Sequence, residues 1–161
     1  MTGNVTIRPA GRGDIALLDR ALRALSADLG DRHVADAACL RAAGFGDGGP
    51  FGAILALRDD EATGAALFTP LFSTTLGGPG AYVSDLWVAS ALRGGGLGRR
   101  LLSAVAKEAR LRWGAGFIRL SVYAGNEDAL AFYRRLGFAP RTEETGLILR
   151  GDAFARLEGC A

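Results

Sequence analysis

A run of glycines between a strand-like segment and a helix-like segment constrains this chain more than any other feature. The segment Ala91–Ala109 reads ALRGGGLGRRLLSAVAKEA and follows AYVSDLWV at Ala81–Val88, whose composition is typical of a strand. Beyond the glycines, apolar residues recur every four positions, which predicts a helix with one apolar stripe against a sheet. The stripe consists of Leu97, Leu101, Val105 and Ala109, with Leu102, Ala106 and Trp113 beside it. The fold must therefore hold a strand, a glycine loop and a helix in direct succession.

The rest of the chain predicts a mixed sheet with helices packed on it. Strands are expected at Val5–Ala10, Phe51–Arg58, Gly64–Thr75, Ala81–Val88, Phe117–Tyr123 and Gly146–Gly151. Helices are expected from a cap at Asp14, over Ala35–Ala42, after the glycines, and from Asn126 to Gly137. The loop GFGDGGPFG at Gly44–Gly52 is expected to be a plain surface connection.

Composition is ordinary for a globular protein. It excludes some classes of protein but does not indicate a function. Of the 161 residues, 49% are apolar and 22% charged, which argues against disorder. The apolar runs are too short to span a membrane, and the polar start, broken by Pro9, predicts no signal peptide. The net charge of +2 does not indicate a nucleic-acid partner. The two cysteines, Cys39 and Cys160, are too few for a disulfide framework, so we expect a cytoplasmic protein.

Three interpretations of the glycines are open: a flexible linker, a simple turn, or a cradle of backbone N–H groups for a phosphate. The first turn of a helix has unpaired N–H groups and the positive end of the helix dipole, and glycines let an anion come close. A P-loop is excluded because its lysine is missing, and a dinucleotide fingerprint because Arg99 stands where its third glycine should be. A linker is disfavoured because strand and helix signals directly adjoin the glycines.

The surrounding motifs favour the cradle. The pattern Arg93-x-x-Gly96-x-Gly98 resembles the acetyl-CoA pyrophosphate loop of the GNAT superfamily of N-acetyltransferases, and NEDALAFYRRLGF at Asn126–Phe138 resembles its second motif. The likeness covers about Val5 to Leu149 and is specific from about Phe72 to Phe138. It implies one N-acetyltransferase domain over residues 1–161, of class α/β (α+β), with a mixed, mostly antiparallel sheet of about six or seven strands and about four helices. FSTTLGGPGAYVSDLWV and TEETG are closest to the diamine and spermidine/spermine acetyltransferase branch.

The resemblance implies acetyl transfer from acetyl-CoA to a primary amine of a small molecule, polyamine-like or amino-acid-like. No Ser-His-Asp or Cys-His arrangement is visible, so direct transfer in a ternary complex is expected. No metal is expected, because His33 is the only histidine and has no metal-spaced partner. The residues implied to bind the cofactor are Leu86, Trp87, Val88, Arg93, Gly94, Gly95, Gly96, Leu97, Gly98, Arg99, Asn126, Ala129 and Tyr133.

Two residues are expected to carry the chemistry. Tyr133 matches the family's tyrosine, whose phenol can give a proton to the departing thiolate. Ser84 stands where the polyamine branch has a glutamate base, and its hydroxyl can hold a water that relays a proton. Strict alternation along the strand would put Asp85 on the face opposite Ser84, so a structural or supporting carboxylate is favoured there over a direct base.

Two other functions remain open on the sequence. One is acetylation of a protein N-terminus or a lysine, which needs an open peptide groove; the other is a non-catalytic acyl-CoA-binding module. Several acidic residues lie in segments that border the family's acceptor site, and they favour a cationic small molecule as the acceptor. They are Asp28, Asp31, Asp36, Glu143 and Glu144. Analogy with the family also implies a homodimer, with neither nucleic acid nor membrane as a partner.

Overall fold

The computed structural model describes residues 4–46 and 48–159, which form two compact units, 1–123 and 124–161. Cys160 lies outside the described residues, and Cys39 is a free, exposed thiol. The expectation of a single domain over the whole chain stays a prediction.

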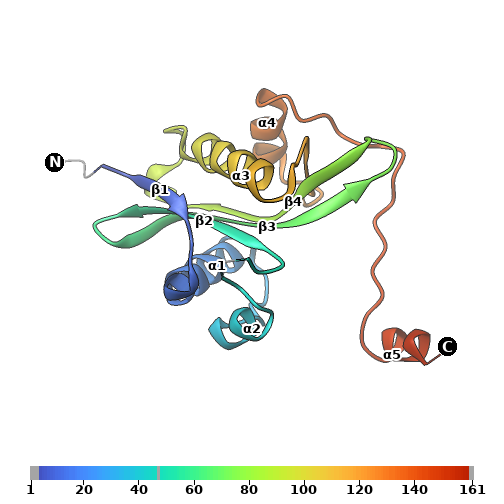
Figure 1. Ribbon diagram of the computed structural model, residues 1–161. Coiled ribbons are helices and arrows are strands. Elements are labelled where there is room, and N and C mark those ends of the chain that lie inside the picture. Colours follow the sequence, from blue (N-terminus) through green and yellow to red (C-terminus); the bar gives the residue numbers. More distant parts are fainter. Residues whose placement is uncertain (1–3, 47, 160–161) are drawn as a thin grey trace. The chain divides into compact units, whose positions relative to one another are not determined.

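The first unit contains a five-stranded sheet in the order β1-β2-β3-β4-β5 (Figure 1). Its first four strands pair antiparallel with their neighbours, and β5 pairs parallel with β4. This is the mixed, mostly antiparallel sheet that the sequence predicts, with one or two strands fewer than expected. The strands are β1 (Thr6–Pro9), β2 (Gly52–Arg58), β3 (Glu61–Ser73), β4 (Gly78–Val88) and β5 (Ile118–Leu120).

Helices cover both faces of this sheet. Helices α1 (Ile15–Leu29) and α2 (Ala37–Ala42) lie on one face and α3 (Leu97–Trp113) on the other (Figure 1). Alternation along β2 divides the core between the two layers. The side chains of Ala53 and Leu55 belong to the cluster that α1 covers, whereas Ile54 and Ala56, also buried, point to the opposite face.

Helix α3 packs with the predicted stripe. Leu97, Leu101, Leu102, Val105 and Ala109 are all buried, and only Ala106 departs from the expectation because it is exposed. The helix can approach the sheet closely because β3 has Gly64 at the contact. A Cβ there would lie 2.9 Å from the Leu101 Cδ1 atom and 3.2 Å from the Trp87 carbonyl oxygen. This contact fixes the start of α3 above the last residues of β4.

The start of α1 differs from the prediction in one detail. Asp14 occupies the N-cap position, but its carboxylate makes no cap hydrogen bond to the helix. It instead accepts from the Arg8 guanidinium at 2.7 and 2.8 Å and from the Gly11 N–H at 2.8 Å. These hydrogen bonds, with the one from Arg8 dominant, lower the pKa of Asp14. The side chain therefore braces the turn before the helix, because a charged donor competes better for it than a helical N–H.

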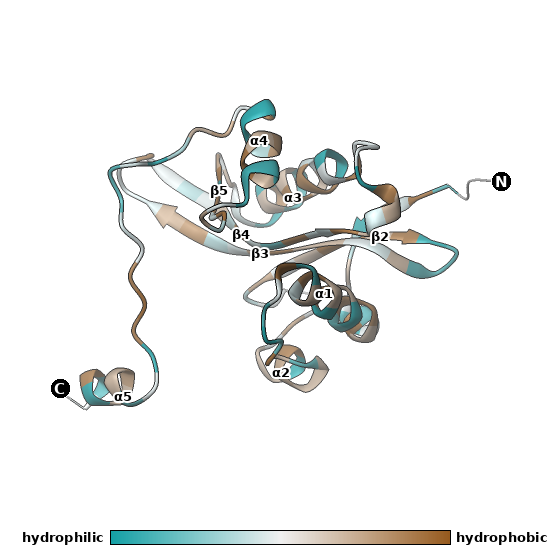
Figure 2. Ribbon diagram, turned by 180° about the vertical axis from the view of Figure 1, so that it is seen from behind, coloured by the Kyte–Doolittle hydropathy of each residue, from teal (hydrophilic) through white to brown (hydrophobic). Residues whose placement is uncertain are grey.

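The second unit contains α4 (Glu127–Arg135) and α5 (Asp152–Glu158), joined by a coil. The strand predicted at Gly146–Gly151 is absent, and the prediction is wrong: these residues pair with no strand of the described chain. Leu147 and Ile148 are 93% and 83% exposed, and Figure 2 colours the middle of this coil as hydrophobic. An apolar run becomes a strand only when a neighbouring edge accepts its hydrogen bonds. Helix α5 was not predicted, although Asp152 in its first turn and Gly159 after it are weak boundary signals.

Candidate functional site

The carboxyl half of β4 has a strand partner on one side only. Its pairing with β3 continues to Val88, whereas its pairing with β5 covers only Ala81 to Val83. From Ser84 to Val88, one backbone edge of β4 therefore faces no strand among the described residues. Unpaired backbone of this kind offers hydrogen bonds to an extended ligand, because it presents a row of N–H and C=O groups.

A β-bulge lies at the point where the two strands part. Phe68 and Ala66 of β3 are two residues apart and share a face, yet their partners Val83 and Leu86 are three residues apart. Two residues of β4, Ser84 and Asp85, thus occupy the space that regular alternation leaves for one. The bulge turns both of their side chains to the same side of the strand.

The predicted separation of Ser84 and Asp85 is therefore wrong. The Ser84 hydroxyl oxygen lies 2.6 Å from the Asp85 Oδ2 atom, and 3.4 Å from the Leu67 carbonyl oxygen. The hydroxyl proton goes to the carboxylate, because a charge-assisted hydrogen bond at 2.6 Å is far stronger than a contact at 3.4 Å. Ser84 is exposed and Asp85 only partly so. The serine oxygen thus stands between the carboxylate and the solvent.

A tyrosine just beyond β5 contacts a second carboxylate. The Tyr123 hydroxyl, just beyond β5, donates to the Asp31 Oδ2 atom at 2.9 Å. That hydrogen bond raises the pKa of Tyr123, and the negative charges of Asp31 and Asp85 raise it further. Tyr123 was missed by the sequence reasoning, since a tyrosine at a strand end has no local pattern that marks it. Of the acidic residues expected near an acceptor, Asp31 is thus the one bonded to Tyr123.

A different set of contacts ties the end of β4 to α1. The Asp28 Oδ2 atom accepts from the Trp87 indole N–H at 3.1 Å and from the Arg93 guanidinium at 2.5 Å. Arg93 also donates from Nε to the Val88 carbonyl oxygen at 2.9 Å. The side chain of Arg93, the first residue of the Arg-x-x-Gly-x-Gly motif, thus connects the end of β4 to α1. The Trp87 ring packs against the core under α1, so it is the backbone of Trp87 that stands at the unpaired edge.

The glycine loop that follows is open. Gly94 and Gly96 have φ of 79° and 80°, in the region where glycine is favoured, and a Cβ at either would meet nothing within 4 Å. In the described part of the chain, the N–H groups of residues 94–99 have no backbone hydrogen-bond partner. Buried Leu97 anchors the first turn of α3. The loop therefore fits the predicted anion cradle: unpaired donors at a helix N-terminus with free space in front of them.

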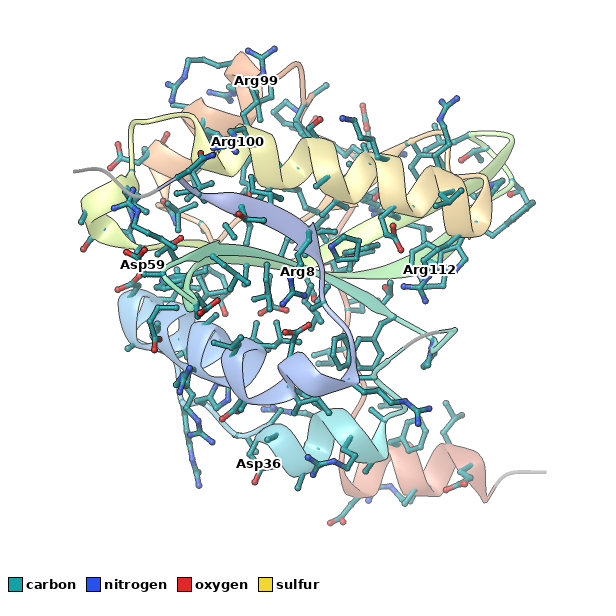
Figure 3. All side chains as sticks on the ribbon, turned by 60° about the vertical axis from the view of Figure 1, so that its left-hand side comes forward. Arg8, Asp36, Asp59, Arg99, Arg100 and Arg112 are labelled. Atoms are coloured by element: carbon teal, nitrogen blue, oxygen red, sulfur yellow. The ribbon has the colours of Figure 1, made fainter. Side chains whose placement is uncertain are left out.

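Two arginines in the first turn of α3, Arg99 and Arg100, flank the cradle, and they differ in their contacts. The Arg100 guanidinium donates to the Val5 carbonyl oxygen at 3.2 Å. Arg99 is exposed, and its side chain makes no hydrogen bond or ion pair within the described residues. Figure 3 places both at the glycine end of α3, with Arg112 at the other end. The predicted roles of Gly95, Gly98 and Arg99 toward a cofactor stay predictions.

The second motif forms α4 in the other unit. The Asn126 side chain accepts from the Ala129 N–H at 3.1 Å, which confirms it as a helix cap. Tyr133 makes edge-to-face contacts with Phe132 and Phe138, with ring centroids 5.0 and 5.4 Å apart. Burial raises the pKa of Tyr133 to about 12, so its phenol keeps its proton throughout the physiological range. The contacts of Asn126, Ala129 and Tyr133 with a cofactor stay predictions.

Other residues singled out in the sequence have structural partners of their own. The Asp36 carboxylate caps α2 through the Cys39 N–H at 2.9 Å, and Glu144 pairs with Arg141 at 2.7 Å. His33 lies against α1, with Nδ1 3.0 Å from the Ser26 hydroxyl. Among the residues that the structure describes, no cluster of His, Cys, Asp or Glu could hold a metal ion. No helix in the described ranges is long and apolar enough to span a membrane.

A separate cavity of about 430 Å³ opens at the C-terminal end of α3. Glu108, Arg112 and Trp113 of that helix and the glycine loop after α2 line it. None of the predicted site residues takes part. Because the cradle is at the other end of α3, the cavity is not the site that the motifs describe.

Comparison with known proteins assigns the class. A family model described as acetyltransferase (GNAT) family matches residues 17–138. The chain belongs to this family, and it is an N-acetyltransferase; the family transfers acetyl groups from acetyl-CoA.

Two curated relatives are informative. A thialysine N-epsilon-acetyltransferase of Sus scrofa is 30% identical, over 97% of this chain and 98% of that protein. An L-ornithine N5-acetyltransferase of Arabidopsis thaliana is 32% identical, over 63% of this chain and 44% of that protein. Among solved structures, an aminoglycoside N-acetyltransferase in complex with CoA superposes with a TM-score of 0.75 at 16% identity, covering 94% of this chain and 97% of that one. At that identity it confirms the fold alone.

Proposed function

We propose that this enzyme acetylates the primary amine of a small cationic molecule, in the manner of the diamine and basic amino-acid acetyltransferases. The observation that carries the proposal is the group of polar side chains at the parting of β4 and β5. It consists of two pairs, the Asp85 carboxylate with Ser84 donating to it on β4, and the Asp31 carboxylate with Tyr123 donating to it just beyond β5. Carboxylates at such a place attract an ammonium group and hold it by charge-assisted hydrogen bonds.

The relatives support this class of acceptor. The two curated names specify a side-chain nitrogen of an amino acid, N-epsilon of thialysine and N5 of L-ornithine. Both acceptors carry positive charge at neutral pH, as an acidic site requires. A polyamine acceptor and a basic amino-acid acceptor present the same reacting group, an alkyl ammonium. The proposal therefore commits to that group and to a small molecule rather than a peptide.

The residues of the cradle suit the cofactor. Acetyl-CoA, when bound, supplies an acetyl thioester as the electrophile. The N–H groups of residues 94–99 would hold its pyrophosphate, with Arg99 adding charge, and the unpaired edge of Ser84–Val88 would hold its pantetheine arm. The Asp28–Arg93 contact keeps that edge in place through the Val88 carbonyl. Tyr133 is proposed as the donor to the leaving sulfur, on the strength of its motif.

A phenol with a pKa of about 12 is a weak acid beside a thiol of pKa about 8.5. Tyr133 would therefore act as a hydrogen-bond donor that transfers its proton only while negative charge builds on the sulfur. We also retain the predictions of a homodimer, a cytoplasmic location and one domain over residues 1–161.

The experiment is a screen of amines for release of free thiol from acetyl-CoA, with mass detection of the product. Its panel contains L-lysine analogues, L-ornithine, diamines, spermidine and peptides with a free N-terminus or an internal lysine. We expect turnover on small cationic amines and little on the peptides. Stabilisation by CoA with no turnover on any amine would instead favour a non-catalytic binding module. As an internal test, Tyr133→Phe should lower kcat and leave the thermal shift caused by CoA unchanged.

A further inference from the structure

Resting on the function proposed above, we propose that Asp85 is the acceptor of the substrate's proton and that it receives this proton through the Ser84 hydroxyl. The bulge of β4 creates the arrangement. It brings the two side chains to one side of the strand and sets the Ser84 oxygen 2.6 Å from the Asp85 Oδ2 atom. Regular alternation would have separated them.

The hydrogen-bond directions fit a relay. The Ser84 proton points to the carboxylate, which leaves the oxygen's lone pairs free to accept a hydrogen from outside. Ser84 is exposed and Asp85 is only partly accessible, so an incoming amine reaches the hydroxyl first. Serine alone is a poor base near neutral pH, but a serine that can pass its own proton to a carboxylate at the same moment is not limited in this way.

Two potential donors near this end of β4 are bonded to other groups. Tyr123 feels the negative charge of Asp85, but its proton is committed to the Asp31 carboxylate at 2.9 Å. The Arg93 guanidinium is committed to Asp28 and to the Val88 carbonyl. Among the described residues, the hydrogen bond made to the Asp85 carboxylate is the one from the Ser84 hydroxyl.

The step balances in atoms and charge. The lone pair of the neutral amine forms the new C–N bond to the acetyl carbon, and the C–S electron pair leaves with the sulfur as thiolate. The nitrogen becomes cationic as the bond forms and gives one proton to the Ser84 oxygen, while the Ser84 hydroxyl proton moves to the Asp85 Oδ2 atom. Asp85 is then a neutral acid, and it returns its proton to solvent after the amide product leaves.

The test compares Ser84→Ala, Asp85→Asn and the double variant, using the best acceptor from the amine screen. If the two residues act as one relay, each single change lowers kcat by roughly 100-fold, and the double change lowers it no further than the worse single one. The KM for acetyl-CoA stays the same, because neither side chain holds the cofactor. Ser84→Thr, which keeps a hydroxyl, should stay within several-fold of wild type.

Controls separate the relay from a structural effect. Thermal stabilisation by CoA shows that each variant is folded with an intact cradle. The matched control is Ser121→Ala, which removes a hydroxyl bonded to Tyr82 at 3.2 Å and should leave kcat unchanged. A further variant, Ser84→Glu with Asp85→Asn, supplies a carboxylate directly and should recover much of the turnover that Asp85→Asn alone loses.

The outcomes distinguish the relay from the function on which it rests. A wild-type enzyme that acetylates no amine overturns both. A wild-type enzyme that acetylates amines while Ser84→Ala retains full kcat overturns the relay alone. The relay is also overturned if the fold loss of kcat in the double variant equals the product of the two single losses, because two independent groups would behave in that way.

Discussion

Two glycine-rich loops of the first unit differ in how much space surrounds their glycines. In the loop at 44–52, residue 47 set aside, the chain closes on itself: a Cβ on Gly49 would overlap the Gly44 carbonyl oxygen, and one on Gly46 would overlap the Arg12 side chain. In the loop at 94–98, Gly94 and Gly96 have positive φ and nothing within 4 Å of a Cβ. Gly44, Gly46 and Gly48 of the first loop also have positive φ, but at Gly46 and Gly49 there is in addition no room for a Cβ. In the second loop the positive φ is the requirement, and the space beside Gly94 and Gly96 is open.

The comparison teaches that composition alone does not identify a ligand loop. Both loops are similarly rich in glycine in the sequence, and the one at 44–52 was expected to be a plain surface connection. It instead packs tightly, with Phe45 and Phe51 stacked at 5.5 Å and the Gly49 carbonyl oxygen accepting from Arg112 at 2.7 Å. What marks the cradle is the position of its glycines at the N-terminus of a long, well-anchored helix.

The largest effect is expected from Gly49→Ala. The new Cβ meets backbone oxygen, which cannot move aside as a flexible side chain can. We expect a loss of about 3 kcal/mol in the free energy of unfolding, at the upper end of the range for overpacking. Urea unfolding at neutral pH measures it, and CoA affinity of the folded fraction should be unchanged. Full stability in this variant would show that the loop is not packed as described.

A smaller loss of stability with a large loss of binding is expected from Gly96→Ala. The positive φ costs about 1–2 kcal/mol for a residue with a Cβ, while the added methyl meets no protein atom. That methyl would occupy the space over the unpaired N–H groups, so CoA affinity should fall by about 10-fold or more. Calorimetric titration with CoA measures the affinity. The control is Gly78→Ala, which has open space and ordinary φ and should alter neither quantity; unaltered CoA affinity in Gly96→Ala would contradict the cradle.

The smallest effect concerns the turn that carries Arg12 beneath the closed loop. Arg8 holds Asp14, which braces this turn, and it lowers the pKa of the Asp14 carboxyl. A lowered carboxyl pKa adds stability above the unfolded value of about 3.9, and that stability is lost as the pH falls through the lower folded value. Because Arg8 is 42% exposed, Arg8→Met should cost about 1 kcal/mol or less at pH 7. Urea unfolding from pH 7 to pH 2.5 should show the two proteins converging in acid; a constant difference would refute this.

The sequence predicted the parts of the fold that depend on local pattern. The α3 stripe, the paired strands β1 to β5 and the Asn126 cap were all found, because burial period and capping chemistry are readable over a few residues. The strand expected at Gly146–Gly151 failed, since pairing depends on an edge elsewhere in the chain. Asp14 does occupy the N-cap position, but its carboxylate is taken by Arg8, six residues earlier, and makes no cap bond to the helix.

The site was predictable only in outline. Motifs pointed to the cradle and to Tyr133, and the acidic residues pointed to a cationic acceptor. The Ser84–Asp85 contact could not be predicted, because the bulge arises from the register with β3 and the local sequence of β4 does not indicate it. Tyr123 was missed for the same kind of reason: its partner Asp31 is 92 residues away.

The bulge in β4 also makes Ser84 a removable residue. Without it, Val83, Asp85 and Leu86 would alternate regularly, and Leu86 and Trp87 would still face Ala66 and Ala65 across the ladder. The core on both sides of the sheet is therefore indifferent to this single position. A residue could be inserted or deleted there without changing which core residues pair across the ladder. The proposed proton relay thus depends on a position that the architecture does not require.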